Sequence, residues 1–108
     1  MNYFEIKPDG QAFIRTDSGT IIRKVGDGES VNHAEFNRNE TLFVITYNSG
    51  RCELRDRKNN LVKSIAGVGV EKAFFRLKTE KGSQKTFRQG EEIVLLVMKD
   101  GSSIEWNE

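Results

Sequence analysis

Cysteine, proline and histidine are almost missing from this chain of 108 residues, which has one of each. The single cysteine, Cys52, cannot form a disulfide within the chain, and this agrees with a reducing compartment. The single histidine, His33, has no cysteine or clustered carboxylate at ligand spacing beside it, so we expect no metal site. Strand alternation places His33 opposite to Ala34 and Phe36, and predicts that it faces solvent.

Charge of one sign is also lacking, because 17 basic residues oppose 16 acidic ones and the formal net charge is +1. Such a chain has no global field that would attract nucleic acid or an anionic membrane, so a charged partner must be recognised by a local patch. No apolar run approaches the length of a membrane span, and the first residues lack the features of a secretory signal. We therefore expect a cytoplasmic protein that makes no use of a membrane.

Motifs of common enzymes are missing as well. There is no Gly-x-Ser-x-Gly elbow, and Gly67-Val68-Gly69 is followed by neither a lysine nor a helical pattern, so it is no phosphate loop. The acidic turns Asp17-Ser18-Gly19 and Asp27-Gly28-Glu29 lack the ligand spacing of a calcium loop. We expect no cofactor and no enzymatic activity, unless carboxylates such as Glu53, Asp56 and Glu91 converge in space.

What the chain does contain is turns and strands. Its ten glycines and many asparagines form short clusters between runs in which apolar and polar residues alternate. No segment has an apolar stripe at helical spacing, so the sequence predicts an all-β fold of antiparallel strands in one domain, 1–108. We expect ten short strands, at 2–7, 11–16, 20–25, 31–36, 41–47, 51–56, 61–65, 70–77, 91–99 and 102–106.

The chain also repeats itself with a period of about forty residues. When Gly10 is aligned with Gly50, apolar positions fall on apolar positions in the strands that follow. An insertion at 78–90 then delays the next strand, and about two and a half repeats are present. The aligned pairs are Ala12 and Cys52, Ile14 and Leu54, Val25 and Ile65, Val31 and Val70, Ala34 and Ala73, and Phe36 and Phe75.

The best-defined repeat has an apolar strand at 31–36, a second at 42–47, a glycine turn, a strand that ends in Arg55-Asp56, and an outer strand at 61–65. This layout resembles a WD-repeat of the β-propeller family, in which the third strand ends in Trp-Asp. The resemblance implies blades of four antiparallel strands packed face to face.

The signature residues of that family are mostly replaced in this chain. Val68 follows Gly67 where the family often has Gly-His, and Trp106-Asn107 is the nearest sequence to Trp-Asp. We therefore do not predict the buried hydrogen-bond network that ties the blades of that family together, and we expect each blade to depend on apolar packing instead. Too few strands are present to close a propeller. We expect that copies associate into a homo-oligomer or, alternatively, that the strands form a compact sandwich or barrel.

Two basic surfaces are candidates for binding a partner. Arg51, Arg55 and Arg57 alternate along one strand, and we predict that they share an exposed or edge face, where like charges discourage strand pairing. The second surface is the insertion with its approach, where an aromatic residue lies among cations. Its residues are Arg76, Lys78, Lys81, Lys85, Phe87 and Arg88.

The function that these features favour is a non-enzymatic protein-protein interaction module, which binds through loops and the exposed basic strand face. One alternative is a nucleic-acid-binding domain that uses the basic insertion. Another is a small inhibitor or immunity protein that masks a second macromolecule. Neither alternative is excluded by the sequence.

Overall fold

A computed structural model of the chain describes residues 1–65, 69–77 and 92–106. The insertion predicted at 78–90 lies outside the described residues. In the described part of the chain, the fold is all-β, with ten short strands close to the predicted positions. They are β1 (Tyr3–Ile6), β2 (Ala12–Arg15), β3 (Ile21–Val25), β4 (Val31–Phe36), β5 (Leu42–Tyr47), β6 (Cys52–Asp56), β7 (Leu61–Ile65), β8 (Val70–Leu77), β9 (Glu92–Met98) and β10 (Ser103–Trp106).

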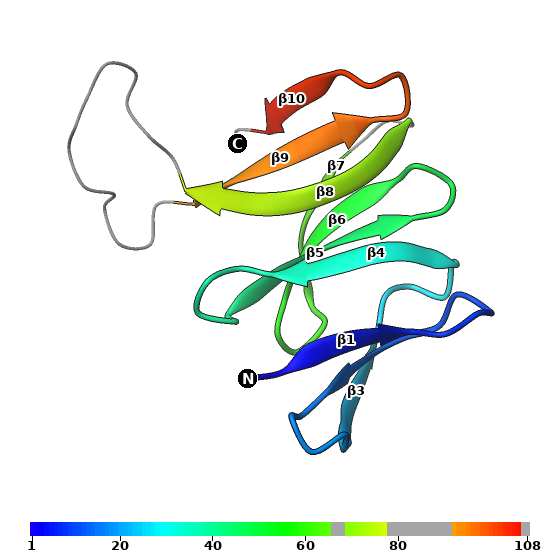
Figure 1. Ribbon diagram of the computed structural model, residues 1–108, viewed down its shortest axis with the longest axis vertical. Helices are drawn as coiled ribbons and strands as arrows, with labels where there is room; N and C mark the ends of the chain where they lie inside the picture. Colours follow the sequence, from blue (N-terminus) through cyan, green and yellow to red (C-terminus); the bar gives the residue numbers. More distant parts are fainter. Residues whose placement is uncertain (66–68, 78–91, 107–108) are drawn as a thin grey trace.

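The strands form three antiparallel sheets, which follow one another along the longest axis of the molecule (Figure 1). Sheet A has the order β1-β2-β3, sheet B has β4-β5-β6-β7, and sheet C has β10-β9-β8. Every pairing joins strands that are neighbours in sequence, which is the arrangement that short hairpin turns produce. Within the described residues the three sheets make an open stack, and no ring closes.

Sheet B is the central layer, and its strand β5 shows why. All five residues from Phe43 to Tyr47 are buried, on both faces of the strand. A strand that is covered on both faces has a continuous apolar run rather than an alternating one, and the segment Leu42–Tyr47 has this character. Sheet A covers one face of β5, and sheet C covers the other.

Two hydrophobic cores result, one at each interface between sheets. The core between sheets A and B consists of Ala12, Ile14, Val25, Val31, Phe43, Ile45 and Tyr47, with Phe4, Ile6, Ala34 and Phe36 packed against it. The core between sheets B and C consists of Val44, Cys52, Leu54, Val70, Ala73, Val94 and Leu96, with Leu42, Phe75, Met98 and Trp106 packed against it. The prediction that Cys52 is a core residue is therefore confirmed.

The predicted repeat is confirmed in detail by the irregularities of the strands. A register shift follows Ile14 in sheet A, and another follows Leu54 at the aligned position in sheet B. The aligned turns also agree, because the carbonyl oxygen of Gly10 accepts the N–H of Val31, and that of Gly50 accepts the N–H of Val70. The two interfaces between sheets are thus built in the same way.

Side chains of sheet B also bind the backbone of β8, the strand of sheet C that lies beside it. Thr46 Oγ1 accepts the Ala73 N–H at 3.1 Å, and Glu35 Oε2 accepts the Phe75 N–H at 3.0 Å. Asn32 Nδ2 donates to the Glu71 carbonyl oxygen at 2.8 Å. Backbone groups at a strand edge that would otherwise need water are therefore satisfied by the neighbouring sheet.

Candidate functional site

The three arginines of the predicted basic face do lie on one side of β6 and its flanks, but that side is not the exposed face that we predicted. Strand β6 is paired with β5 and β7, so it is no edge strand. The turn between β3 and β4 lies over this side, and Arg55 is only 8% exposed. The expectation of an exposed or edge face was wrong for Arg55, because the chain packs a second sheet where one sheet alone would face solvent, whereas Arg57 is exposed.

Arg55 is held in a buried polar network with Tyr47 and Glu53. The Tyr47 hydroxyl donates to Glu53 Oε1 at 2.6 Å, and Arg55 Nε donates to the same oxygen at 2.9 Å. Arg55 also donates through a terminal nitrogen to the Asn59 carbonyl oxygen at 2.7 Å. Charged groups this deeply buried are tolerated only when they are paired and hydrogen-bonded, and here both conditions are met.

Arg51 extends this network to the surface. Its guanidinium donates to Glu53 Oε2 at 3.0 Å and forms ion pairs with Asp27 and Glu29 of the turn between β3 and β4. The guanidinium also lies over the ring of Tyr47, 4.7 Å from the centroid. Arg51 is therefore engaged by three carboxylates and an aromatic face, which leaves little of its charge for a partner.

The hydrogen bonds around Glu53 set the protonation states of the network. Burial alone would raise the pKa of Glu53, but hydrogen bonds from Tyr47, Arg55 and Arg51 outweigh it and hold that pKa below its usual 4.5. Burial and the bond to Glu53 raise the pKa of Tyr47 well above its usual 10. At neutral pH the carboxylate is thus ionised and the phenol is protonated, as the donor directions require.

The network ties sheet B to the loop that leads out of sheet A. The Asp27 N–H donates to the Tyr47 hydroxyl oxygen at 3.1 Å, and the Gly26 N–H donates to Asn59 Oδ1 at 3.0 Å. Our expectation that apolar packing takes the place of buried hydrogen bonds between the repeats was therefore wrong. The signature residues of the WD-repeat are replaced, and Tyr47, Glu53 and Arg55 provide a network of different composition.

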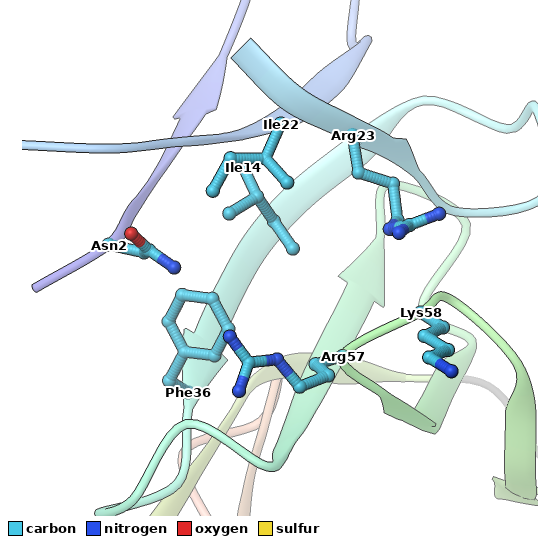
Figure 2. A pocket seen from close by; sticks show the side chains of 7 residues that line it. All are labelled: Asn2, Ile14, Ile22, Arg23, Phe36, Arg57 and Lys58. Carbon is cyan, nitrogen blue, oxygen red and sulfur yellow. The ribbon is translucent and has the colours of Figure 1, made fainter. Parts of the chain in front are cut away.

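A basic pocket lies at the other end of the interface between sheets A and B (Figure 2). Its volume is about 190 Å³, and it opens to solvent. Phe36 at the end of β4 and Ile14 on β2 give it apolar walls (Figure 2). The full lining is Asn2, Ile14, Ile22, Arg23, Phe36, Arg57 and Lys58, and we call it the basic pocket.

Three cations surround the basic pocket. Arg23 comes from β3, whereas Arg57 and Lys58 come from the turn between β6 and β7 (Figure 2). All three side chains are exposed, and within the described residues none of them forms an ion pair. The nearby Asp56 carboxylate accepts the backbone N–H groups of Lys58 and Asn60, both at 2.9 Å, so it is committed to the turn.

The interface between sheets B and C has a hollow at the place equivalent to the basic pocket. A comparison of the two linings shows which features of the basic pocket come from the repeat and which occur in that pocket only. Leu54 and Phe75 line this second hollow where Ile14 and Phe36 line the basic pocket. Leu42 replaces Asn2, and among the described residues of the lining Glu92 is the one with a charged side chain. The hollow itself is therefore a product of the stacking. Among the residues that the structure describes, the cluster of cations occurs in the basic pocket and not in the second hollow.

The remaining candidate residues are dispersed or undescribed. Arg76 is exposed on β8, in sheet C, far along the stack from the basic pocket. Of the carboxylates that might have converged, Glu53 lies in the buried network, Asp56 ends β6 and accepts hydrogen bonds from the turn that follows, and Glu91 lies outside the described residues. The predicted residues that also lie outside them are Lys78, Lys81, Lys85, Phe87 and Arg88.

His33 is partly buried and Cys52 is fully buried. His33 was predicted to face solvent, but its side chain is only 26% exposed, and its Nε2 atom lies 3.8 Å from Glu35 Oε1 against sheet C. Burial raises the pKa of the Cys52 thiol to about 11, so the reactive thiolate is disfavoured at neutral pH. No cluster of three metal-ligating side chains is found in the described ranges, and no helix there could span a membrane.

Comparisons with known proteins add no constraint to this geometry. No protein-family model matches the sequence, and a search of curated proteins found no match. Of the predicted binding residues that the structure describes, Arg57 lies in the basic pocket, where it meets Arg23 and Lys58. Sequence reasoning missed Arg23 because it lies about thirty residues from Arg57, on a different sheet.

Proposed function

We propose that this protein is a non-enzymatic interaction module, and that its basic pocket binds an acidic side chain of a partner protein. The observation that supports this proposal is the meeting of Arg23, Arg57 and Lys58, without ion-pair partners among the described residues, around apolar walls. A carboxylate that enters the pocket would gain charge-assisted hydrogen bonds in a partly water-excluded place.

The size of the basic pocket favours a side chain as its ligand. Pockets that bind cofactors and drug-sized molecules usually measure roughly 300 to 1,000 Å³. At about 190 Å³, the basic pocket is too small for such a ligand and large enough for a glutamate or aspartate side chain with a neighbouring apolar group. Phe36 and Ile14 would contact the apolar group while the cations contact the carboxylate.

The turn that carries Arg57 and Lys58 is well fixed for such a role. Asp56 caps this turn from one side, and the Arg57 N–H donates to the Thr41 carbonyl oxygen at 3.2 Å. Asn59 adopts a positive φ of 71° and binds the backbone of Gly26. A fixed turn loses less conformational entropy when a partner binds, so more of the contact energy contributes to affinity.

The architecture supports an interaction role more generally. We propose that sheets A, B and C are WD-repeat-like blades, since sheet B has four strands in sequential order and its packing on both neighbours follows one pattern. Stacked blades are rigid scaffolds that present turns on a common rim. In this chain the turn with Arg57 would be such a binding element.

The proposal can be tested with a labelled decapeptide that alternates glutamate with leucine. We expect wild-type protein to bind this peptide in fluorescence anisotropy, and we expect Arg57→Gln to weaken binding by about tenfold, as loss of one charge-assisted contact would. Arg76→Gln is the matched control, because it removes an exposed arginine on sheet C. Equal losses of affinity for both variants would indicate nonspecific electrostatic attraction and would refute binding of the peptide at the basic pocket.

The same assay distinguishes nucleic acid as the partner. A single-stranded oligonucleotide that binds more tightly than the peptide, with an affinity that falls steeply with salt, would replace our proposal by the nucleic-acid alternative. Peptide binding that depends on both the glutamates and the leucines, with only modest dependence on salt, would support the protein partner.

A further inference from the structure

The outward face of sheet C, opposite to the face that packs on sheet B, carries apolar side chains. Leu95 on β9 is flanked by Ile93 and Val97 on the same strand and by Phe74, its partner on β8. All four side chains are half-buried. Since Val94 and Leu96 between them point into the core with sheet B, both faces of β9 are apolar, as on the central strand β5.

The repeat identifies what kind of surface this is. Strand β9 aligns with β5, because Ala73 pairs with Leu96 as Ala34 pairs with Ile45. Leu95 then aligns with Val44, which is fully buried because sheet C packs upon it. The outward face of sheet C is therefore the counterpart of a face that, in sheet B, is an interface with the next sheet.

Sheet A also has an outer face, opposite to the face that packs on sheet B. Its inner face packs on sheet B through Ala12 and Ile14. Its outer face carries Tyr3, Phe13 and Ile21 together with the ion pair of Glu5 and Arg15. Tyr3 is 44% exposed and Ile21 is 47% exposed. Each sheet of the stack has one face for the sheet that precedes it and one face for the sheet that follows it. Sheets A and B meet in this way, and so do sheets B and C. The outward face of sheet C is the face for a following sheet, so its matching partner is the outer face of a sheet A, which is the face for a preceding sheet.

We propose that a second copy of this chain packs the outer face of its sheet A on the outward face of sheet C, and so continues the stack from one copy to the next. The contact is head to tail, so each copy has one donor face and one acceptor face. Such a contact produces a closed ring if the rotation closes and a longer assembly if it does not. The inference does not depend on the basic pocket, which lies inside the chain between sheets A and B.

The experiment uses two variants of the full chain, Leu95→Glu on sheet C and Phe13→Glu on sheet A. Masses are measured by light scattering across a dilution series, and the circular dichroism melt of each variant confirms that it is folded. Wild-type protein should exceed the mass of one chain, and each variant alone should be a monomer because one of its two faces is lost. Val97→Glu serves in place of Leu95→Glu if that variant does not fold.

The decisive step is to mix the two variants. The intact sheet C of Phe13→Glu can receive the intact sheet A of Leu95→Glu, so the mixture should form a one-to-one dimer that grows no further. Association of Phe13→Glu alone would indicate a contact between two sheets C and would overturn the head-to-tail proposal. A monomeric wild-type protein, or a mixture that stays monomeric, would overturn it as well.

Discussion

The Tyr47 hydroxyl donates a 2.6 Å hydrogen bond to Glu53 Oε1, and the two residues come from adjacent strands on either side of one glycine turn. Around this bond the chain assembles Arg55, Arg51 and the backbone of Asp27, which belongs to the loop from the preceding sheet. The bond therefore lies where two repeats meet. Its geometry depends on the packing of sheet A on sheet B.

Replacement of Glu53 by glutamine should destabilise the fold. Arg55 would keep its buried charge with no carboxylate to compensate it, and breaking a buried pair in this way costs about 3 kcal/mol or more. We expect this loss in the free energy of unfolding, measured with urea at neutral pH. Glu29→Gln is the control, because its carboxylate is 43% exposed and its loss should cost less than about 1 kcal/mol. Equal midpoints for the two variants would contradict the role of the network.

Gly50 should tolerate no side chain. Its φ is +94°, and a Cβ atom there would lie 2.6 Å from the backbone nitrogen of Gly69, which cannot move aside as a side chain can. Gly28 has a similar φ of +103° but has open space around it. We expect Gly50→Ala to lower the free energy of unfolding by roughly 2 kcal/mol more than Gly28→Ala does, since the shared backbone strain cancels in the comparison. A thermal melt in which both variants behave alike would disprove the close approach.

Much of the fold was predictable because its signals are local. Turn glycines such as Gly10 and Gly50 are adjacent in sequence to the strands that they join, and both adopt the positive φ that their position in the turns suggested. The turn after β4 was less predictable, since Glu40, rather than an asparagine, has the positive φ of 60°. The alignment of Phe36 with Phe75 also held, since each packs against the core of its own interface.

Phe36→Ala and Phe75→Ala should each destabilise the protein by about 3 kcal/mol, which is the lower end for loss of a large aromatic side chain, because both residues are only partly buried. Phe36 stacks on Phe4 with ring centroids 4.3 Å apart, so its loss also removes an aromatic pair. Chemical denaturation of both variants measures these losses. A wild-type free energy of unfolding for either one would break the proposed equivalence of the two interfaces.

Stability should fall as the pH is lowered through the usual histidine value of 6.5. Burial lowers the pKa of His33, with a smaller opposing effect from Glu35 and a further lowering from Lys72. Below pH 6.5 the unfolded chain takes up a proton that the folded chain takes up only at a lower pH. The free energy of unfolding therefore falls between these two pH values. Carboxylates such as Glu53 contribute only nearer to their own pKa values, below 4.5.

Urea unfolding at about pH 7.5 and about pH 5.5 isolates this effect, because His33 is the one histidine of the chain. His33→Gln has no imidazole to protonate, so its stability should change much less over the same interval. An unchanged pH slope in this variant would show that another group is responsible.

The candidate site was much less predictable than the fold. Arg51, Arg55 and Arg57 share a strand face, but the sequence does not show that Arg55 is buried beneath the loop from sheet A while Arg57 is exposed. That difference depends on how one sheet packs on the next, which is a tertiary property. The partners of Arg57 in the basic pocket have the same origin, since Arg23 reaches it from another sheet.

The most direct test of the proposed function is an amide chemical-shift titration of the protein with the glutamate-leucine peptide. We predict that the largest shifts cluster on Asn2, Arg23, Phe36, Arg57 and Lys58, which surround the basic pocket. Arg57→Gln should abolish that cluster without changing the rest of the spectrum. Shifts that cluster instead around Arg76 on β8, or saturable binding with no shift at the basic pocket, would contradict our account.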